Sequence, residues 1–203
     1  MRPALAILAA GASQRLGQCK ALVHIGEKRV LEHLLDAARS LASEPALVVT
    51  GAHHTEISAC PELAGRAVEW LENPNWELGR TGGIALAYAH RPGRDLLLAP
   101  VDCPLVPARV FDALADEWAR VGAPARGWLA PRFYMETGQA RFGHPVILGR
   151  DLLAEISSAL PDAPLRDVRN GADPLLALDV DAIEVLDDLD TPEDLDFLAV
   201  RGR

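Results

Sequence analysis

Residues 5–20 read LAILAAGASQRLGQCK, an apolar run that breaks at Gly11 and is followed by two cations, Arg15 and Lys20. The run is long enough for a buried strand and too short for an ordinary helix. Gly11 tolerates a positive φ and lets a ligand approach the backbone, so free amide groups there suit phosphate oxygens. The stretch is therefore either a phosphate-binding loop or a strand–helix turn that is merely rich in Gly and Ala.

The spacing of the glycines excludes two well-known nucleotide-binding loops. A P-loop requires G-x-x-x-x-G-K-[ST], but Gly11 and Gly17 are separated by five residues and Gln18 follows instead of Lys. The dinucleotide fingerprint G-x-G-x-x-G is also absent, because Ser13 stands at the position of its second glycine. A different phosphate-binding pattern has to be considered.

The stretch resembles L-A-A-G-x-S-x-R-M-G-x-x-K, the opening motif of the MobA-like nucleotidyltransferases and most specifically of the molybdenum cofactor cytidylyltransferases. In this chain Leu16 replaces the usual Met and Cys19 stands where Pro is frequent, and neither change affects a charged position. The resemblance implies that the motif binds the nucleotide. The residues that it assigns to the nucleotide are Leu8, Ala9, Ala10, Gly11, Ser13, Arg15 and Lys20.

Composition limits the class of protein. The chain has 203 residues, 49% of them hydrophobic, and a net charge of −9, which argues against a general nucleic-acid binder but leaves a local anion pocket possible. The cysteines Cys19, Cys60 and Cys103 form no paired framework or metal spacing, and their odd number suits a reducing compartment. The start of the chain leaves no room for a signal peptide, and no apolar run reaches the roughly 20 residues of a membrane span. We expect a cytoplasmic protein whose residues 1–203 form a single domain.

Strand and helix signals alternate along the chain, which predicts parallel βαβ units and an α/β fold. Strands are expected at residues 5–10, 46–50, 68–71, 96–101, 127–131 and 175–180, and helices at 30–41, 107–121, from 151 and at 165–170. Residues 132–141 are expected to be a polar loop. The resemblance implies a Rossmann-like three-layer sandwich, with a mostly parallel sheet and helices on both faces. His53 and His54 suggest metal ligands, but adjacent side chains diverge on a helix, which favours solvated side chains.

A second glycine-rich stretch, Gly79-Arg80-Thr81-Gly82-Gly83, precedes an Ala-rich helix expected to end near Ala89. Thr81 is a candidate N-cap for this helix. The glycines equally suit a loop in which a flat base lies against the backbone. In the family this region carries G-M-S-S-S or a similar run and meets the nucleotide, which implies nucleotide contacts from Gly79, Thr81 and Gly82. The Thr81-Gly82-Gly83 run departs from that pattern.

Asp102 directly follows an apolar strand, at the edge of the sheet where open α/β folds bind ligands. It could instead cap the helix at 107–121, but it comes several residues too early for that role. The family motif D-x-P-L matches Asp102, Pro104 and Leu105, and implies that Asp102 binds Mg²⁺ and is catalytic.

The run Thr191-Pro192-Glu193-Asp194 is a good helix start, with Thr at the N-cap and Pro at the first helical position. The helix start does not explain Asp190, which precedes the N-cap and is placed where its carboxylate can point into a cleft. The family motif D-I-D-T-P-E-D aligns here without gaps and implies that Asp190 is the second Mg²⁺ ligand. Gly143-His144-Pro145 also recurs in the family, beside the acceptor side of the cleft, which implicates His144.

These residues suit nucleotidyl transfer, which requires positioning and charge neutralisation rather than a covalent catalyst. Mg²⁺ would be held by two hard carboxylates, Arg15 would bind pyrophosphate bidentately, and Lys20 would act as a point charge near the α-phosphate. The resemblance implies a catalytic set of Lys20, Arg15 and Asp102 and a donor NTP, most specifically CTP because L-A-A-G replaces L-A-G-G. The implied acceptor is phosphorylated molybdopterin-type cofactor, with a molybdoenzyme as a possible receiving partner.

Three other functions remain open. A sugar-phosphate nucleotidyltransferase is the nearest, and a non-catalytic carrier that delivers finished molybdenum cofactor belongs to a different class. A glycosyltransferase that uses a nucleotide sugar is the third, but Lys20 argues against it because that reaction keeps the diphosphate on the nucleotide. The intact set of Arg15, Lys20, Asp102 and Asp190 favours catalysis over carriage.

Overall fold

A computed structural model of the chain describes residues 2–41, 43–158 and 162–201. The strands are β1 (Ala4–Ala9), β2 (His24–Ile25), β3 (Lys28–Arg29), β4 (Ala46–Thr50), β5 (Val68–Glu72), β6 (Leu96–Pro100), β7 (Trp128–Tyr134), β8 (Ala140–Phe142), β9 (Val146–Leu148) and β10 (Leu175–Asp179). The α-helices are α1 (Val30–Ala37), α2 (His54–Ser58), α3 (Arg80–His90), α4 (Ala108–Arg120), α5 (Arg150–Ser158), α6 (Leu165–Asn170) and α7 (Pro192–Arg201). Short 3₁₀ turns lie at η1 (Lys20–Leu22), η2 (Arg39–Leu41), η3 (Pro61–Leu63), η4 (Trp76–Leu78) and η5 (Ile183–Leu186).

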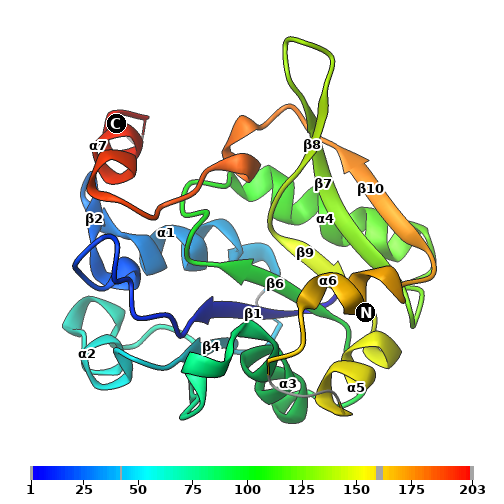
Figure 1. Cartoon of the computed structure of the whole chain (residues 1–203), viewed down its shortest axis with the longest axis horizontal. Coiled ribbons are helices and arrows are strands. Elements are labelled where there is room, and N and C mark those ends of the chain that lie inside the picture. Colours follow the sequence, from blue (N-terminus) through cyan, green and yellow to red (C-terminus); the bar gives the residue numbers. More distant parts are fainter. Residues whose placement is uncertain (1, 42, 159–161, 202–203) are drawn as a thin grey trace.

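Within these described residues, eight strands form one sheet in the order β10-β7-β9-β6-β1-β4-β5, with β8 paired to β7 (Figure 1). Neighbours are parallel for β1 with β4 and β6, for β4 with β5 and for β7 with β10. The exceptions are β9, antiparallel to β6 and β7, and β8, antiparallel to β7. The prediction of a mostly parallel sheet is confirmed.

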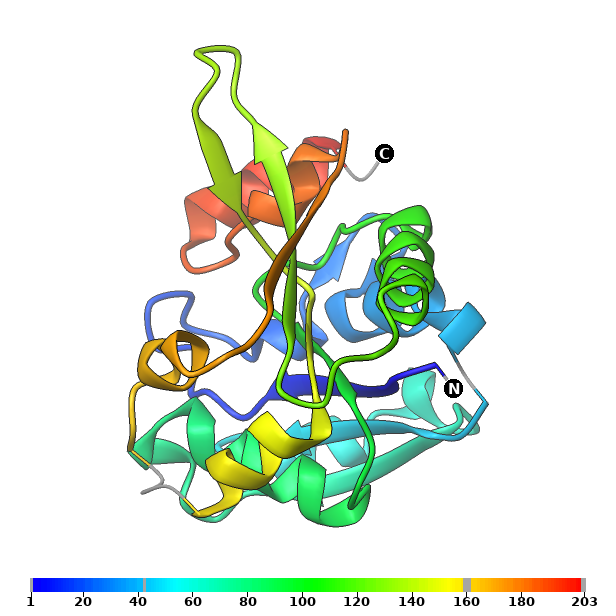
Figure 2. The same cartoon turned by 90° about the vertical axis from the view of Figure 1, so that its right-hand side faces the viewer.

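Alternate residues of the central strands face opposite layers, as the twofold period of a strand requires. In β1, Leu5 and Ile7 join the core that contains α1 and α4, whereas Ala4 and Ala6 join the core that contains α3 and α5. Both faces of the sheet are therefore covered by helices (Figures 1 and 2). Each fully buried Leu or Ile stabilises such a core by about 1.5–3 kcal/mol. The predicted Rossmann-like three-layer fold is confirmed.

The polar loop predicted at residues 132–141 is wrong in its first and last parts. β7 continues through Tyr134 and pairs with β8, so these residues form a hairpin that projects from the body of the molecule (Figure 2). Arg132 also pairs with Asp179 of β10, through backbone register and a 2.5 Å side-chain contact. The polar side chains reflect the exposure of the hairpin and not an irregular backbone.

The N-cap predicted at Thr81 is also wrong. Gly79 is the N-cap of α3, and Thr81 lies inside the first turn, where its hydroxyl donates a 2.6 Å hydrogen bond to the carbonyl of Ala163. Gly79 has a φ of 124°, a conformation that favours glycine. The helix begins at Arg80, two residues before the start that an N-cap at Thr81 would give. No helix in the described ranges has the length and apolar character needed to cross a membrane.

The order of the strands fixes where a ligand can bind. β1 lies between β4 and β6, and the chain runs from β1 to β4 and β5 on one side before it returns to β6 on the other. In open α/β sheets the crevice at such a reversal, outside the carboxyl ends of the strands, is the usual ligand site. The segments that follow β1 and β6 leave the sheet at this edge, and they contain the loop at residues 10–20 and Asp102.

Candidate active site

The loop after β1 is closed on itself by two internal contacts. The backbone N–H of Lys20 donates to Ser13 Oγ at 3.2 Å, and the N–H of Gly17 donates to the Ser13 carbonyl at 3.0 Å. Ser13 adopts a φ of 53°, a left-handed conformation that costs a non-glycine residue of order 1 kcal/mol. The space around a Cβ built at Gly11 is open. The loop is thus a preformed turn with room for a ligand against its backbone.

An ammonium group lies between two carboxylates at the end of this loop. Lys20 Nζ donates to Asp102 Oδ1 at 2.9 Å and to Asp190 Oδ1 at 2.5 Å, and only 11% of the Lys20 side chain is exposed. Arg15 donates from Nη2 to the other oxygen of Asp190 at 2.5 Å, while 71% of its own side chain is exposed. The four charged residues assigned from the sequence are therefore brought together.

A backbone contact brings the C-terminal segment to Asp102. The N–H of Leu189 donates to the Asp102 carbonyl at 2.9 Å, and the Cys103 thiol donates to the Asp187 carbonyl at 3.0 Å. Beyond Asp190, Thr191 and Asp194 form the predicted helix start: the Thr191 N–H donates to Asp194 Oδ2, and the Asp194 N–H donates to Thr191 Oγ1. The N-cap prediction is confirmed, and the cap fixes the backbone next to Asp190.

The protonation states follow from these contacts. The hydrogen bond from Lys20 holds the pKa of Asp190 below its usual range, assisted by Arg15. Burial acts to lower the pKa of Lys20, but the hydrogen bonds to Asp190 and Asp102 outweigh burial and raise it. Asp188 has the opposite shift: burial, then the charges of Asp190 and Asp102, raise its pKa. Asp188 is therefore a third carboxyl group close enough to feel the charges of Asp102 and Asp190, and sequence reasoning did not assign it to the site. Its position in the acidic run before Thr191 was the sequence feature that could have indicated it.

The donor atoms in this cluster suit a hard divalent cation. Asp102 and Asp190 offer carboxylate oxygens, which Mg²⁺ prefers, and their side chains are 28% and 18% exposed. Both carboxylates already contact one cationic group, the Lys20 ammonium. The residues therefore fit a magnesium ion in charge and in chemistry.

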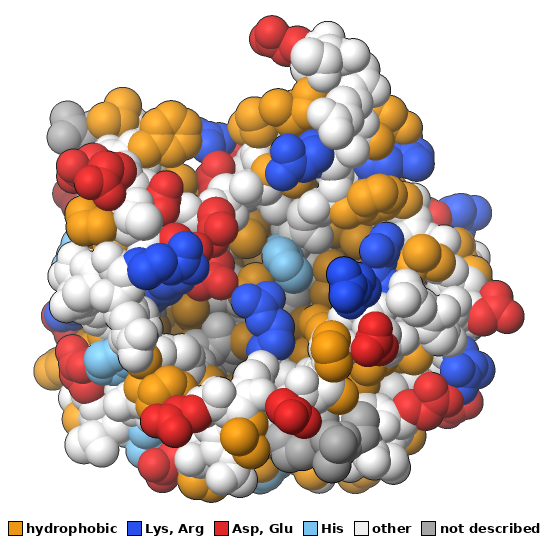
Figure 3. All heavy atoms as spheres, viewed as in Figure 1, with side chains coloured by type: hydrophobic (Ala, Val, Ile, Leu, Met, Phe, Trp, Pro, Cys, Tyr) orange, Lys and Arg blue, Asp and Glu red, His pale blue; other side chains and the backbone are white. Residues whose placement is uncertain are grey.

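A cavity of about 480 Å³ extends from this cluster along the carboxyl edge of the sheet, a volume within the usual range for small-ligand sites. Figure 3 shows the hollow in this face of the molecule, with basic and acidic side chains around it. The predicted site residues that line the cavity are Leu8, Ala9, Ala10, Gly11, Ser13, Arg15, Lys20, Gly79, Asp102 and Asp190. Thr81 and Gly82 are not among the described residues of its wall, and Thr81 is only 2% exposed.

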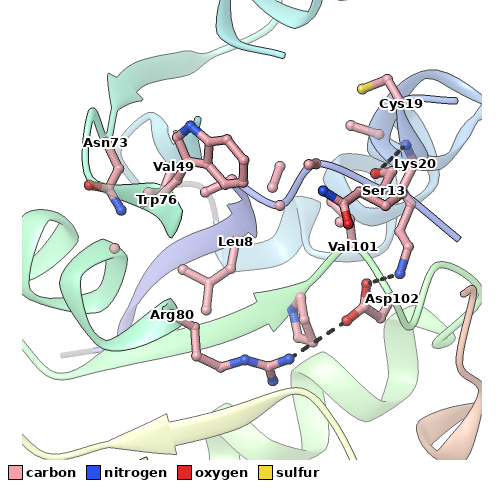
Figure 4. Close-up of a pocket in the computed structure, with 18 of the residues that line it drawn as sticks. Leu8, Ser13, Cys19, Lys20, Val49, Asn73, Trp76, Arg80, Val101 and Asp102 are labelled. Carbon is pink, nitrogen blue, oxygen red and sulfur yellow. Dashed lines mark hydrogen bonds and ion pairs between the residues drawn. The ribbon is translucent and has the colours of Figure 1, made fainter. Parts of the chain in front are cut away.

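The opposite wall of the cavity contains residues that sequence reasoning missed. Trp76 and Asn73 lie there, and Arg80 reaches to within 4.0 Å of Asp102 (Figure 4). Asn73 is buried, and its Nδ2 group has no hydrogen-bond partner among the described residues. Gly51 permits this wall, because a Cβ there would lie 2.6 Å from Cβ of Trp76. Asn73 followed by Pro74 had indicated only a turn.

His144 is not among the residues that line this cavity, and its backbone N–H donates to the Val185 carbonyl at 2.9 Å. Burial lowers the pKa of His144 to about 4, and the charge of Arg80 acts in the same direction. The imidazole is therefore neutral at neutral pH. Its Nδ1 atom is buried and has no hydrogen-bond partner in the described part of the chain.

The low pKa of His144 predicts a loss of stability in acid. A histidine with a pKa near 6.5 in the unfolded chain and about 4 in the folded chain binds its proton first in the unfolded state. The free energy of unfolding should therefore fall by about 2–3 kcal/mol between pH 7 and 4.5 through this group alone. Urea denaturation of wild type and His144→Gln over that range should show a shallower pH dependence in the variant.

The exposed His90 provides the control for this measurement. His90→Gln should keep the wild-type pH dependence. Equal slopes for wild type and His144→Gln would show that the histidine is not held neutral by burial.

Residues 5–177 match the family model described as MobA-like NTP transferase domain. A curated protein of Carboxydothermus hydrogenoformans, named probable molybdenum cofactor guanylyltransferase, is 32% identical over 112 residues. The match covers 55% of this chain and 52% of that protein, so it spans about half the length of the curated relative.

Solved structures share the fold over the whole chain. The crystal structure of Rv0371c from Mycobacterium tuberculosis H37Rv has a TM-score of 0.78 at 24% identity, covering 98% of this chain and 99% of that one. The 2-C-methyl-D-erythritol 4-phosphate cytidylyltransferase from Thermus thermophilus has a TM-score of 0.73 at 18% identity, with both chains fully covered at 100%. At these identities the likeness concerns the fold alone.

Proposed function

Because the chain belongs to the family of MobA-like NTP transferase domains, we propose that it transfers a nucleotidyl group from an NTP to a phosphorylated small-molecule acceptor and releases pyrophosphate. The observation that carries the proposal is the position of the Lys20 ammonium between Asp102 and Asp190, at one end of the cavity behind the glycine turn. The proposal treats residues 1–203 as one nucleotidyltransferase domain.

Each charged residue then has a task in the transfer. Attack of the acceptor on the α-phosphorus increases negative charge on the nonbridging oxygens and on the departing pyrophosphate. Lys20 would leave its two carboxylates to meet that charge, and the exposed guanidinium of Arg15 would bind the triphosphate bidentately. Asp102 and Asp190 would hold Mg²⁺, which when bound supplies charge neutralisation to the phosphate oxygens.

The base would lie between the loop after β1 and the wall formed by Trp76, Asn73 and Gly83. A flat ring suits the space beside an indole, and the buried Asn73 amide offers an N–H donor to a base acceptor atom. Ala10 lines the cavity where the guanylyl branch has Gly, which favours the smaller pyrimidine. We therefore propose CTP as the donor and molybdopterin-type cofactor as the acceptor. GTP is the second candidate, because the curated relative is named a guanylyltransferase.

A screen of ATP, GTP, CTP and UTP against molybdopterin-type and sugar-phosphate acceptors tests the proposal. Pyrophosphate release should require Mg²⁺ and an acceptor, with kcat/KM for CTP exceeding that for GTP by about tenfold or more. Ala10→Gly should reduce this preference more than it reduces the use of CTP. The same change at a neighbouring position, Ala12→Gly, serves as the control and should leave the preference unchanged.

The outcomes separate the candidates. A kcat/KM for GTP equal to or above that for CTP rejects the cytidylyl assignment and leaves nucleotidyl transfer standing. Turnover with a sugar phosphate alone identifies the sugar-phosphate alternative. Binding of finished cofactor without pyrophosphate release from any NTP identifies a carrier.

A further inference from the structure

Behind the loop after β1, three side chains of metal-ligand type converge on one point. A sulfur of Cys19, a ring nitrogen of His53 and a carboxylate oxygen of Glu56 all lie within 4.8 Å of one another. Figure 4 shows the Cys19 sulfur turned away from the Lys20–Asp102 pair. A second cavity, of about 400 Å³, is lined by Cys19 and Glu56 and gives the cluster access to solvent. Cys19 also lines the first cavity, but none of the three side chains has a role in the proposed reaction.

The histidine pair noticed in the sequence is split by the fold. His54 Nδ1 lies 2.7 Å from Thr50 Oγ1, away from the cluster, and neither histidine is simply solvated. His53 Nε2 lies 3.2 Å from the carbonyl oxygen of Ala12, an atom that can only accept a hydrogen bond. His53 Nδ1 lies 3.2 Å from Glu56 Oε2. A neutral imidazole has one N–H group and can donate to only one of these two acceptor oxygens, so a cation bound at Nδ1 would occupy that lone pair while Nε2–H donates to Ala12.

We propose that Cys19, His53 and Glu56 bind a thiophilic divalent cation of the zinc class, at a site separate from Asp102 and Asp190. A sulfur, nitrogen and oxygen set suits Zn²⁺, whereas Mg²⁺ takes oxygen ligands. The hydrogen bond from Nε2 to the Ala12 carbonyl is the outer contact that metal-bound histidines usually make. Binding forms a metal–sulfur bond and breaks the S–H bond of Cys19, whose proton passes to solvent.

The site is close to the geometry that such a cation needs. Tetrahedral zinc with bonds of about 2.0–2.3 Å separates its ligand atoms by roughly 3.5 Å, so the cluster has to contract by about 1 Å. A water or another ligand would take the fourth position. Cys19 precedes Lys20, and Ala12 belongs to the opposite arm of the loop. The bound cation therefore links both arms of the nucleotide-facing loop to α2.

Cobalt binding to the metal-stripped full chain tests the site without any measurement of turnover. In excess Mg²⁺, which occupies the proposed Asp102–Asp190 site, wild type should show a thiolate-to-cobalt charge-transfer band that saturates at one Co²⁺ per chain, and Zn²⁺ should abolish the band. Cys19→Ser should remove the band, while His53→Gln should weaken binding by roughly tenfold or more. Cys103→Ser is the matched control, because its buried thiol donates to the Asp187 carbonyl and should not affect the band.

Two variants keep the proposal open to rejection if Cys19→Ser folds poorly. Glu56 is exposed, so Glu56→Gln should fold normally and should weaken Co²⁺ binding by about tenfold. Cys60→Ser should retain the band, because that thiol has its own partner, Glu62, at 3.1 Å. Unchanged affinity in Glu56→Gln, a band that survives in Cys19→Ser, or a band lost in Cys60→Ser would each overturn the proposed ligand set. Absence of the band in wild type would reject the site and leave the 3.2 Å contact of His53 with Glu56 as an ordinary polar contact.

Discussion

Replacement of Asp102 by Asn is expected to reduce kcat by roughly 10²–10³-fold or more, because it removes one of two carboxylates proposed to hold Mg²⁺ at the reacting phosphate. The amide keeps the shape of the side chain and its place beside Lys20 Nζ. The carboxylate is 28% exposed and belongs to the cavity, so the fold should persist. Pyrophosphate release at saturating NTP measures the loss, and urea denaturation checks the fold.

Two further variants make this result specific. Asp190→Asn should cause a loss of similar size, because Asp190 is the other carboxylate bonded to Lys20. Asp116→Asn is the control: its side chain is 69% exposed and pairs with Arg2, outside the cavity. Near-wild-type, Mg²⁺-dependent turnover in both Asp102→Asn and Asp190→Asn would remove these residues from the proposed site.

Replacement of Lys20 by Met should lower kcat by roughly 10²–10³-fold while changing NTP affinity much less. The reason is that the ammonium is held by Asp102 and Asp190 before the reaction and meets phosphate charge mainly as that charge develops. Arg15→Ala should have the opposite signature, with weaker NTP binding and a smaller loss of kcat, because an exposed guanidinium meets a triphosphate that is charged from the outset. Single-turnover rates with measured NTP affinities separate the two.

The Lys20 variant also has an expected acid-stability signature. The pKa of Asp190 is held below its unfolded value mainly by Lys20, so this pair stabilises the fold above the unfolded pKa and loses its effect as pH falls through the folded pKa. Lys20→Met should flatten that part of the pH dependence, below about pH 4.

If Lys20→Met and Arg15→Ala lose equal affinity for NTP with unchanged kcat, the roles assigned to Lys20 and Arg15 in the transfer are wrong.

The central sheet was predictable because its strands are buried on both faces. Strands of this kind have continuous apolar stretches, which can be recognised in a sequence. β4 spans the predicted residues 46–50, and β1 differs from the predicted strand by one residue at each end. The β7–β8 hairpin was missed for the converse reason. It projects into solvent, so its polar residues carry no signal of burial.

The motifs assigned Arg15, Lys20, Asp102 and Asp190 to one site, and the fold brings these four side chains together. Their roles in that site stay predictions. The cavity wall that contains Trp76 and Asn73 was not predictable in the same way. The position of Trp76 depends on the absence of a side chain at Gly51, a contact between positions far apart in the sequence. Thr81 was misplaced because the helix begins at Arg80, which turns the Thr81 hydroxyl towards Ala163.

The dependence of the site on the last segment has a consequence for how the chain matures. Lys20 and Asp190 are 170 residues apart, so their contact closes a loop that contains most of the chain and cannot exist on the ribosome until almost all of it has emerged. The helix that follows, α7, buries Leu198 but leaves Phe197 and Val200 exposed, so its detachment costs less than unfolding the sheet. A nascent or mildly heated molecule can therefore have a complete sheet and still lack the proposed catalytic centre. We therefore expect the Lys20–Asp190 contact to form late in folding and to be lost early on heating.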